Sequence, residues 1–293
     1  MRKCLRSSGP EGARLLRTVQ CLEKSGLSLA QALCRVLLDA SYEGTIRQAA
    51  GRVLTLSNTA APAQALTRRF LEEDSRAELI EIAKLVRELR MPLAVPALIQ
   101  ALDDSNVDRR EAAAYALGFP GSGMRAVQAL SRVLTDSSEL PHVRGLAAES
   151  LHGQRKAVPV LLSVLSDPAV EVRFWAVWAL GTAAGRMDPT VMSTLEPKLT
   201  DQSMHPGWWS VAREALAVLG TSAPSGSQYQ QQFDHELARV SSDVNVSPED
   251  RRWAEFWGRE IGIPPIPKQK ARSVHGTGQE ALPWLTEPYT DSV

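Results

Sequence analysis

The sequence repeats itself with a period of about 32 residues, and this repetition constrains the fold more than any other feature. Residues 29–39 (LAQALCRVLLD) resemble residues 126–136 (AVQALSRVLTD), and residues 94–104 (AVPALIQALDD) resemble residues 157–167 (AVPVLLSVLSD). Each segment has apolar residues at helical spacing and ends on an acidic residue. Repeats of this length build solenoids, in which each helical hairpin packs on its neighbours. The pattern therefore predicts an all-α solenoid.

The acidic residues that close these segments mark the period: Asp39, Asp104, Asp136, Asp167 and Asp201. The last four are separated by 32, 31 and 34 residues, and the first interval of 65 residues spans two periods. We therefore expect residues 65–89 to hold a degenerate unit.

A second helix is predicted after each acidic residue. Its signature is an arginine followed seven residues later by a leucine: Arg47–Leu54, Arg110–Leu117, Arg144–Leu151 and Arg173–Leu180. Glycines follow the leucine register, and we expect them to end the helices with positive φ: Gly118, Gly153, Gly181 and Gly220. Pro96 and Pro159 share a position early in the first helices, where a missing N–H costs little.

The alternation of aspartate and arginine has a structural interpretation. The aspartate lies in the turn and can accept backbone N–H groups at the start of the second helix. The arginine, such as Arg173, lies one to two turns into that helix and can reach an aspartate of its own or an adjacent repeat. The alternative, a row of catalytic carboxylates, requires a function for every repeat. We therefore expect the ion pairs to stabilise the fold.

These features together resemble HEAT repeats, in particular the short HEAT-like repeats of the phycobilisome-lyase type. The resemblance covers residues 27–220 and is clearest over residues 92–185, where the period and the acid–(V/I)R–AA–LG string coincide. It implies a right-handed α-solenoid of about seven helical hairpins, with the second helices on the concave side. It also implies protein–protein scaffolding more often than catalysis.

Both ends depart from the repeat. We expect an N-terminal segment with a capping helix over residues 1–26, a loop over 221–228, a last helical hairpin over 229–262 and a Pro-rich irregular tail over 263–293. In the last hairpin, Ser247 is the expected N-cap, followed by Pro248 at the first helical position. The PWL motif at 283–285 could dock locally.

Composition narrows the classes of function. Lys plus Arg equals Asp plus Glu at 33 each, and this neutrality makes a nucleic-acid partner unlikely. The three cysteines lie at 4, 21 and 34 without close spacing, which is typical of a reduced cytoplasmic protein. Apolar runs are too short for a membrane span. The pattern predicts no particular oligomeric state.

Motifs for chemistry are missing from the sequence. The five histidines have no metal-ligand spacing, and GFPGSG (118–123) has glycines but lacks the strand and the Lys-Ser/Thr of a phosphate loop. We therefore expect no catalytic residue, no metal and no cofactor, and interpret GFPGSG as a turn between helices.

Three aromatic residues crowd into EVRFWAVWALG (171–181). In other repeats the positions of Phe174, Trp175 and Trp178 hold Gln, Glu, Gly or Arg, which predicts that they are partly exposed. Trp175 is the expected centre of a contact surface, with Trp178 on the same helical face and Glu171 one turn earlier. The alternative is that Phe174 and Trp178 pack between repeats.

Three further residues belong to the expected partner-binding set. Tyr115 lies two repeats before the aromatic cluster, and Trp209 could stack with Arg213 four residues later. Trp253 and Trp257 in the last hairpin are expected to pack in the core of the cap.

The sequence thus predicts a non-catalytic scaffold or adaptor that binds a protein or peptide on its concave face through aromatic anchors. Two enzymatic alternatives remain open. One is a bilin lyase, suggested by the repeat class. The other is a HEAT-like DNA glycosylase, a family that presents tryptophans and a carboxylate in a basic groove, as Trp175, Trp178 and Glu171 could. The zero net charge argues against the second.

Overall fold

A computed structural model describes residues 9–27, 29–39, 41–55, 61–183, 189–243 and 245–261. These residues form helices and connecting turns, with an isolated β-bridge between Met204 and Ser210. The predicted all-α fold is confirmed. The chain divides into two compact units, Met1–Leu151 and His152–Val293, a division that the repeat pattern did not predict. Across the described ranges, no helix is both long and apolar enough to cross a bilayer.

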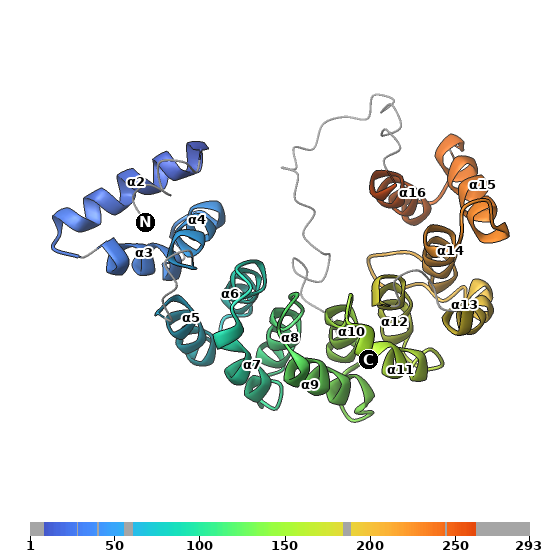
Figure 1. Ribbon diagram of the computed structural model, residues 1–293, viewed down its shortest axis with the longest axis horizontal. Coiled ribbons are helices and arrows are strands. Elements are labelled where there is room, and N and C mark those ends of the chain that lie inside the picture. Colours follow the sequence, from blue (N-terminus) through green and yellow to red (C-terminus); the bar gives the residue numbers. More distant parts are fainter. Residues whose placement is uncertain are drawn as a thin grey trace. The chain divides into compact units, whose positions relative to one another are not determined.

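Among its described residues, the first unit has an N-terminal helix and four helical pairs. Their bounds are α2 (Gly9–Lys24), α3 (Leu29–Leu38), α4 (Gly44–Thr55), α5 (Ala61–Glu72), α6 (Arg76–Glu88), the 3₁₀ helix η1 (Pro92–Ala94), α7 (Val95–Ala101), α8 (Val107–Ala116), α9 (Met124–Thr135) and α10 (Pro141–Ser150). The first helices α3, α5, α7 and α9 form one layer, and the second helices α4, α6, α8 and α10 form the other (Figure 1). Residues 65–89 lie within the pair α5–α6, so the degenerate repeat is present.

The described part of the second unit holds three more pairs. Their bounds are η2 (Arg155–Ala157), α11 (Val158–Ser163), α12 (Val170–Ala183), α13 (Pro189–Leu195), η3 (Glu196–Thr200), α14 (Val211–Ser222), α15 (Gln228–Ser242) and α16 (Pro248–Glu260). Helix α12 packs on α14, α14 on α15, and α15 on α16. Ser247 caps α16 as expected, because its hydroxyl accepts a hydrogen bond from Asp250 N at 3.0 Å. The predicted tail over 263–293 and its PWL motif lie outside the described residues.

The period-marking aspartates organise the turns between paired helices. Asp104 and Asp167, for example, each accept a hydrogen bond from the backbone N–H two residues later, at 2.8 and 2.9 Å. These acceptors stabilise the turn itself and not the helix start that we expected, which in α8 is capped by Asn106. The acids therefore fix the connection between the two helices of a pair.

Arg110 and Arg173 of the second helices each connect their pair to the next, as the sequence predicted for Arg173. Its guanidinium donates to the backbone oxygens of Asp167 and Pro168 at 2.8 and 3.0 Å. It also donates to the Asp201 carboxylate, 28 residues later, at 2.8 Å. Arg110 repeats this arrangement with Glu139, at 2.7 Å. The ion pairs thus form a ladder that joins successive repeats.

The glycines at the ends of the leucine register have a different role from the predicted one. Gly153 alone of the four has a positive φ, of 69°. Gly181 and Gly220 lie inside α12 and α14, where neighbouring helices approach closely. A Cβ placed on Gly220 would overlap the Cβ of Phe233. At these positions glycine permits close helix packing, and the expectation of helix caps was wrong there.

Replacing Gly220 by alanine should therefore destabilise the second unit by about 1–3 kcal/mol, because the added methyl overlaps Phe233 of α15. Gly258 is the matched control, since it lies inside α16 and a Cβ there would meet nothing within 4 Å. Gly258→Ala should be neutral or stabilise by up to about 1 kcal/mol. Urea unfolding of both variants measures the difference, and equal effects would contradict the close-packing role.

Candidate functional site

The second unit contains a continuous cluster of aromatic rings. Phe174 and Trp175 of α12 contact His205 from the 201–210 segment, with ring centroids 4.6 and 5.5 Å apart. Trp208 packs edge-on against Trp175 at 5.6 Å and against Phe256 of α16 at 6.0 Å. Rings from three parts of the unit therefore form one packed body, and the contacts of Trp208 with Trp175 and Phe256 have the edge-to-face geometry that aromatic pairs prefer.

Four rings of this cluster are only partly buried: Trp178, Trp208, Phe256 and Trp257. We call these four residues the aromatic edge. Trp178 joins it through Trp175, at 5.6 Å, and Trp257 joins it through Phe256, at 5.4 Å. His152 lies against Trp178 at 5.2 Å. Large rings that are partly exposed and mutually packed are characteristic of interaction surfaces.

The expected exposure of Trp175 was wrong. Its side chain is 4% exposed, and Phe174 is 1% exposed, so both rings lie in the core of the cluster. The reason is the 201–210 segment, which places His205 and Trp208 against them. Trp178 is half-buried, as expected for a partial contact surface, and Glu171 is half-buried in the first turn of α12.

One feature of the sequence indicates that Trp175 is covered by the 201–210 segment, and comparison of the repeats does not include it. This feature is the length of the connection before α14. Helices α8 and α12 begin three residues after Asp104 and Asp167, whereas α14 begins ten residues after Asp201. The additional length is the segment that includes HPGWW (205–209). A longer connection with two tryptophans indicates a local elaboration, and here it buries Trp175 and contributes Trp208 to the aromatic edge.

Trp209 is also buried, at 2% exposure, and it does not stack with Arg213 as predicted. Its indole N–H donates instead to the Glu214 carboxylate at 2.7 Å. Arg213 lies over the ring of Trp253, with 4.9 Å between the guanidinium carbon and the ring centroid. The predicted core position of Trp253 is correct, since this side chain is fully buried.

Two titratable groups lie inside the cluster. Burial raises the pKa of Glu214 to about 7, although the hydrogen bond from Trp209 opposes this effect. Burial lowers the pKa of His205 to about 4, because the imidazolium form loses its hydration there. Both side chains therefore favour their neutral forms near pH 6, a carboxylic acid for Glu214 and an uncharged imidazole for His205.

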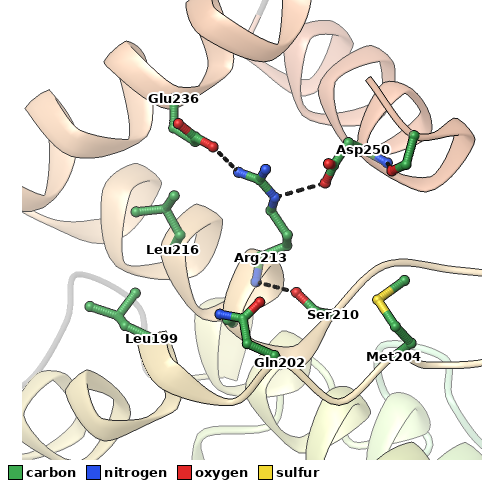
Figure 2. A pocket seen from close by; sticks show the side chains of 10 residues that line it. Leu199, Gln202, Met204, Ser210, Arg213, Leu216, Glu236 and Asp250 are labelled. Carbon is green, nitrogen blue, oxygen red and sulfur yellow. Dashed lines mark hydrogen bonds and ion pairs between the residues drawn. The ribbon is translucent and has the colours of Figure 1, made fainter. Parts of the chain in front are cut away.

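Arg213 occupies the wall of a pocket of about 390 Å³ that lies beside the cluster (Figure 2). Figure 2 shows its guanidinium between two carboxylates, and it donates to Glu236 at 2.5 Å and to Asp250 at 2.9 Å. The pocket thus combines elements α14, α15 and the start of α16. Arg213, expected as a partner contact, lines a cavity where a ligand could reach it.

Tyr115 of α8 lies in the first unit, where it packs against Arg87. The Arg87 guanidinium carbon lies 4.3 Å from the centroid of the Tyr115 ring. Arg87 also donates both terminal nitrogens to the Glu149 carboxylate, each at 2.9 Å. Burial raises the pKa of the Tyr115 hydroxyl. Tyr115 is therefore engaged within its own unit as well as partly exposed.

Within the part of the chain that the structure describes, no group of three or more His, Cys, Asp or Glu side chains is suited to a metal ion. The GFPGSG segment connects α8 to α9, as the sequence analysis proposed, and Gly121 and Gly123 have φ values of 94° and 92°.

Paired helices that stack with a period near 32 residues, joined by arginine–carboxylate pairs, define a helical-repeat protein of the solenoid class. Comparison with family models agrees, since the model described as HEAT repeats matches residues 66–152 and 137–217, which is more than half of the chain. The chain belongs to the HEAT-repeat family. The match does not extend to the phycobilisome-lyase subtype, which stays a prediction. Among curated proteins, none matches the sequence.

Proposed function

We propose that the protein is a non-catalytic scaffold or adaptor whose second unit binds a protein or peptide partner at the aromatic edge. The observation that supports this most is the set of four partly exposed rings, Trp178, Trp208, Phe256 and Trp257. HEAT repeats are commonly protein-interaction scaffolds. The edge combines rings of the second helices α12 and α16, the layer that we expect to be concave, with Trp208 from the 201–210 segment.

The physical argument concerns preorganisation. A partly exposed Trp or Phe leaves apolar area in water, and a partner that covers it gains about 25 cal/mol per Å². The edge rings rest on buried rings, among them Phe174, Trp175 and Trp209, so binding would not have to order them. Of the predicted contacts, Trp178 and Glu171 would touch the partner. The three buried rings would not touch it but would hold the edge rings in position.

The glycosylase alternative requires an exposed Trp175 beside Glu171. This ring is 4% exposed, so the main argument for the glycosylase alternative no longer holds. The bilin-lyase alternative has no support beyond the repeat class. Titration with labelled duplex DNA at low and moderate salt tests the first directly. We expect no salt-dependent binding; strong binding that weakens with salt would favour the glycosylase reading.

The proposed function is tested by affinity purification from the native host, with mass spectrometry, on matched variants. A partner captured by the wild type should bind at least about tenfold more weakly to Trp178→Ala and Trp208→Ala, equivalent to about 1.4 kcal/mol. Tyr42→Ala is the control, because Tyr42 is a half-buried aromatic residue of the first unit. Circular dichroism establishes that each variant is folded. Equal capture by all variants would contradict an aromatic binding surface.

A further inference from the structure

We propose that the pocket of Figure 2 binds one uncharged, apolar side chain from an extended segment of the partner. This inference rests on the proposed function, because it specifies what the partner must present to the second unit. The pocket is distinct from the aromatic edge, and none of the four edge residues lines it. It would therefore add a second, selective contact.

The pocket offers apolar surface from three directions. Leu199 comes from η3, Leu216 from α14, and Met204 from the 201–210 segment (Figure 2). Met204 is 51% exposed, so its thioether is accessible from solvent. A side chain that enters the pocket would remove this thioether and both leucines from water. Its volume of about 390 Å³ falls within the range of about 300–1,000 Å³ typical of ligand pockets.

The charge on the pocket wall selects against a charged occupant. Glu236 accepts hydrogen bonds from Arg213 and also from Arg239, at 2.5 and 2.7 Å. These two guanidinium groups hold the pKa of Glu236 at about 2, so the carboxylate stays ionised. Asp250 also accepts from Arg213, at 2.9 Å, so both carboxylates of the wall are already paired with guanidinium groups, although Arg239 itself lies outside the lining. A lysine or glutamate entering the pocket would lose hydration without meeting an unpaired opposite charge.

The wall is also held in place before any ligand arrives. The Trp253 indole N–H donates to the backbone oxygen of Arg213 at 3.1 Å, and its ring lies under the guanidinium. Because Trp253 is fully buried, Arg213 cannot easily turn away to pair with a ligand. At the rim, Gln202 is exposed and its side-chain amide can both donate to and accept from the main chain of an extended peptide. These features fit a peptide segment whose side chain enters the pocket.

The test uses the full chain and a phage-displayed library of random 12-residue peptides. We expect the selected peptides to share one apolar position, and replacement of that residue by Lys or Glu in synthetic peptides should weaken binding at least about tenfold. The protein variant Met204→Glu should weaken the same peptides by a similar factor, because it places a charge at the pocket rim. Met124→Glu is the matched control, since Met124 is an exposed methionine of the first unit.

The outcomes separate the two proposals. Peptides that lose affinity for Trp178→Ala but bind Met204→Glu as well as wild type would support the aromatic edge and overturn the pocket. A shared charged position in the selected peptides, with binding lost in Met204→Glu, would overturn the choice of an uncharged side chain. Selection of no peptide at all would contradict peptide binding by the second unit, and the pocket proposal with it. Circular dichroism establishes that each protein variant is folded before its peptide binding is compared with wild type.

Discussion

Replacing Arg87 by alanine is expected to destabilise the first unit by about 3–5 kcal/mol. Arg87 on α6 and Glu149 on α10 form a bidentate ion pair, and their side chains are 15% and 5% exposed. Removal of the guanidinium leaves a buried carboxylate without its counter-charge, and this loss is larger than the contribution of the intact pair. Urea unfolding followed by far-UV circular dichroism measures the effect.

A matched pair in the same unit provides the control. Arg132 and Asp103 make an ion pair of similar geometry, at 2.7 Å, but their side chains are 54% and 61% exposed. Arg132→Ala should therefore change stability by less than about 1 kcal/mol. The double variant Arg87→Met/Glu149→Leu should recover most of the loss, because it removes both charges from the core. If Arg87→Ala and Arg132→Ala are equally mild, the Arg87 pair is not buried in solution.

The second large effect concerns pH and Glu214. Its pKa is about 7 in the folded chain against an ordinary value of 4.5, so the protonated acid is favoured by folding. The associated stability is fully present below pH 4.5 and is lost as the pH rises through about 7. The difference corresponds to about 3 kcal/mol. Glu214→Gln removes this dependence, so its stability relative to wild type should rise by about 3 kcal/mol between pH 4.5 and pH 8.5.

The comparison with the variant is necessary because His205 acts in the opposite direction. Its pKa is lowered to about 4, so its contribution is present above pH 6.5 and is lost as the pH falls through about 4. Between pH 4.5 and 6.5 the contributions of the two groups to stability change in opposite directions, so the pH dependence of wild-type stability does not reveal either one.

All seven tryptophans follow residue 151, so their fluorescence reports unfolding of the second unit. Glu255→Gln, at an exposed position of α16, is the control, and an identical pH profile for both variants would contradict the assignment to Glu214.

The parts of the fold that could be predicted from the sequence depend on local pattern. Helix positions, the Asp-containing turns and the reach of Arg173 follow from residues that recur at one spacing. The role of Gly220 could not be predicted in this way, because it depends on how closely α15 approaches α14. A glycine one or two residues after a leucine has the same local sequence whether it ends a helix or lies against Phe233.

The candidate site was less predictable, for a related reason. Comparing repeats identified Trp178 correctly as partly exposed, but it placed Trp175 at the surface because it treats every repeat as equally covered. The elaborated connection before α14 breaks that assumption. Phe256 and Trp257 could not be assigned to the edge from sequence, since Phe256 reaches Trp208 from a different repeat and Trp257 joins it through Phe256. Contacts between repeats depend on three-dimensional stacking, which the alignment does not contain.

The Arg87–Glu149 pair connects residues that are 62 positions apart, and thus passes over α8 to join α6 with α10. In the simplest description of a repeat array, each repeat exchanges energy with its immediate neighbours alone, and terminal repeats can fray one at a time. A bond that skips a repeat adds a next-nearest-neighbour coupling, so loss of order in α8 also removes the support of both flanking repeats. We expect hydrogen exchange of amides in α6, α8 and α10 to proceed through one shared opening event. In Arg87→Ala these helices should exchange with separate rates.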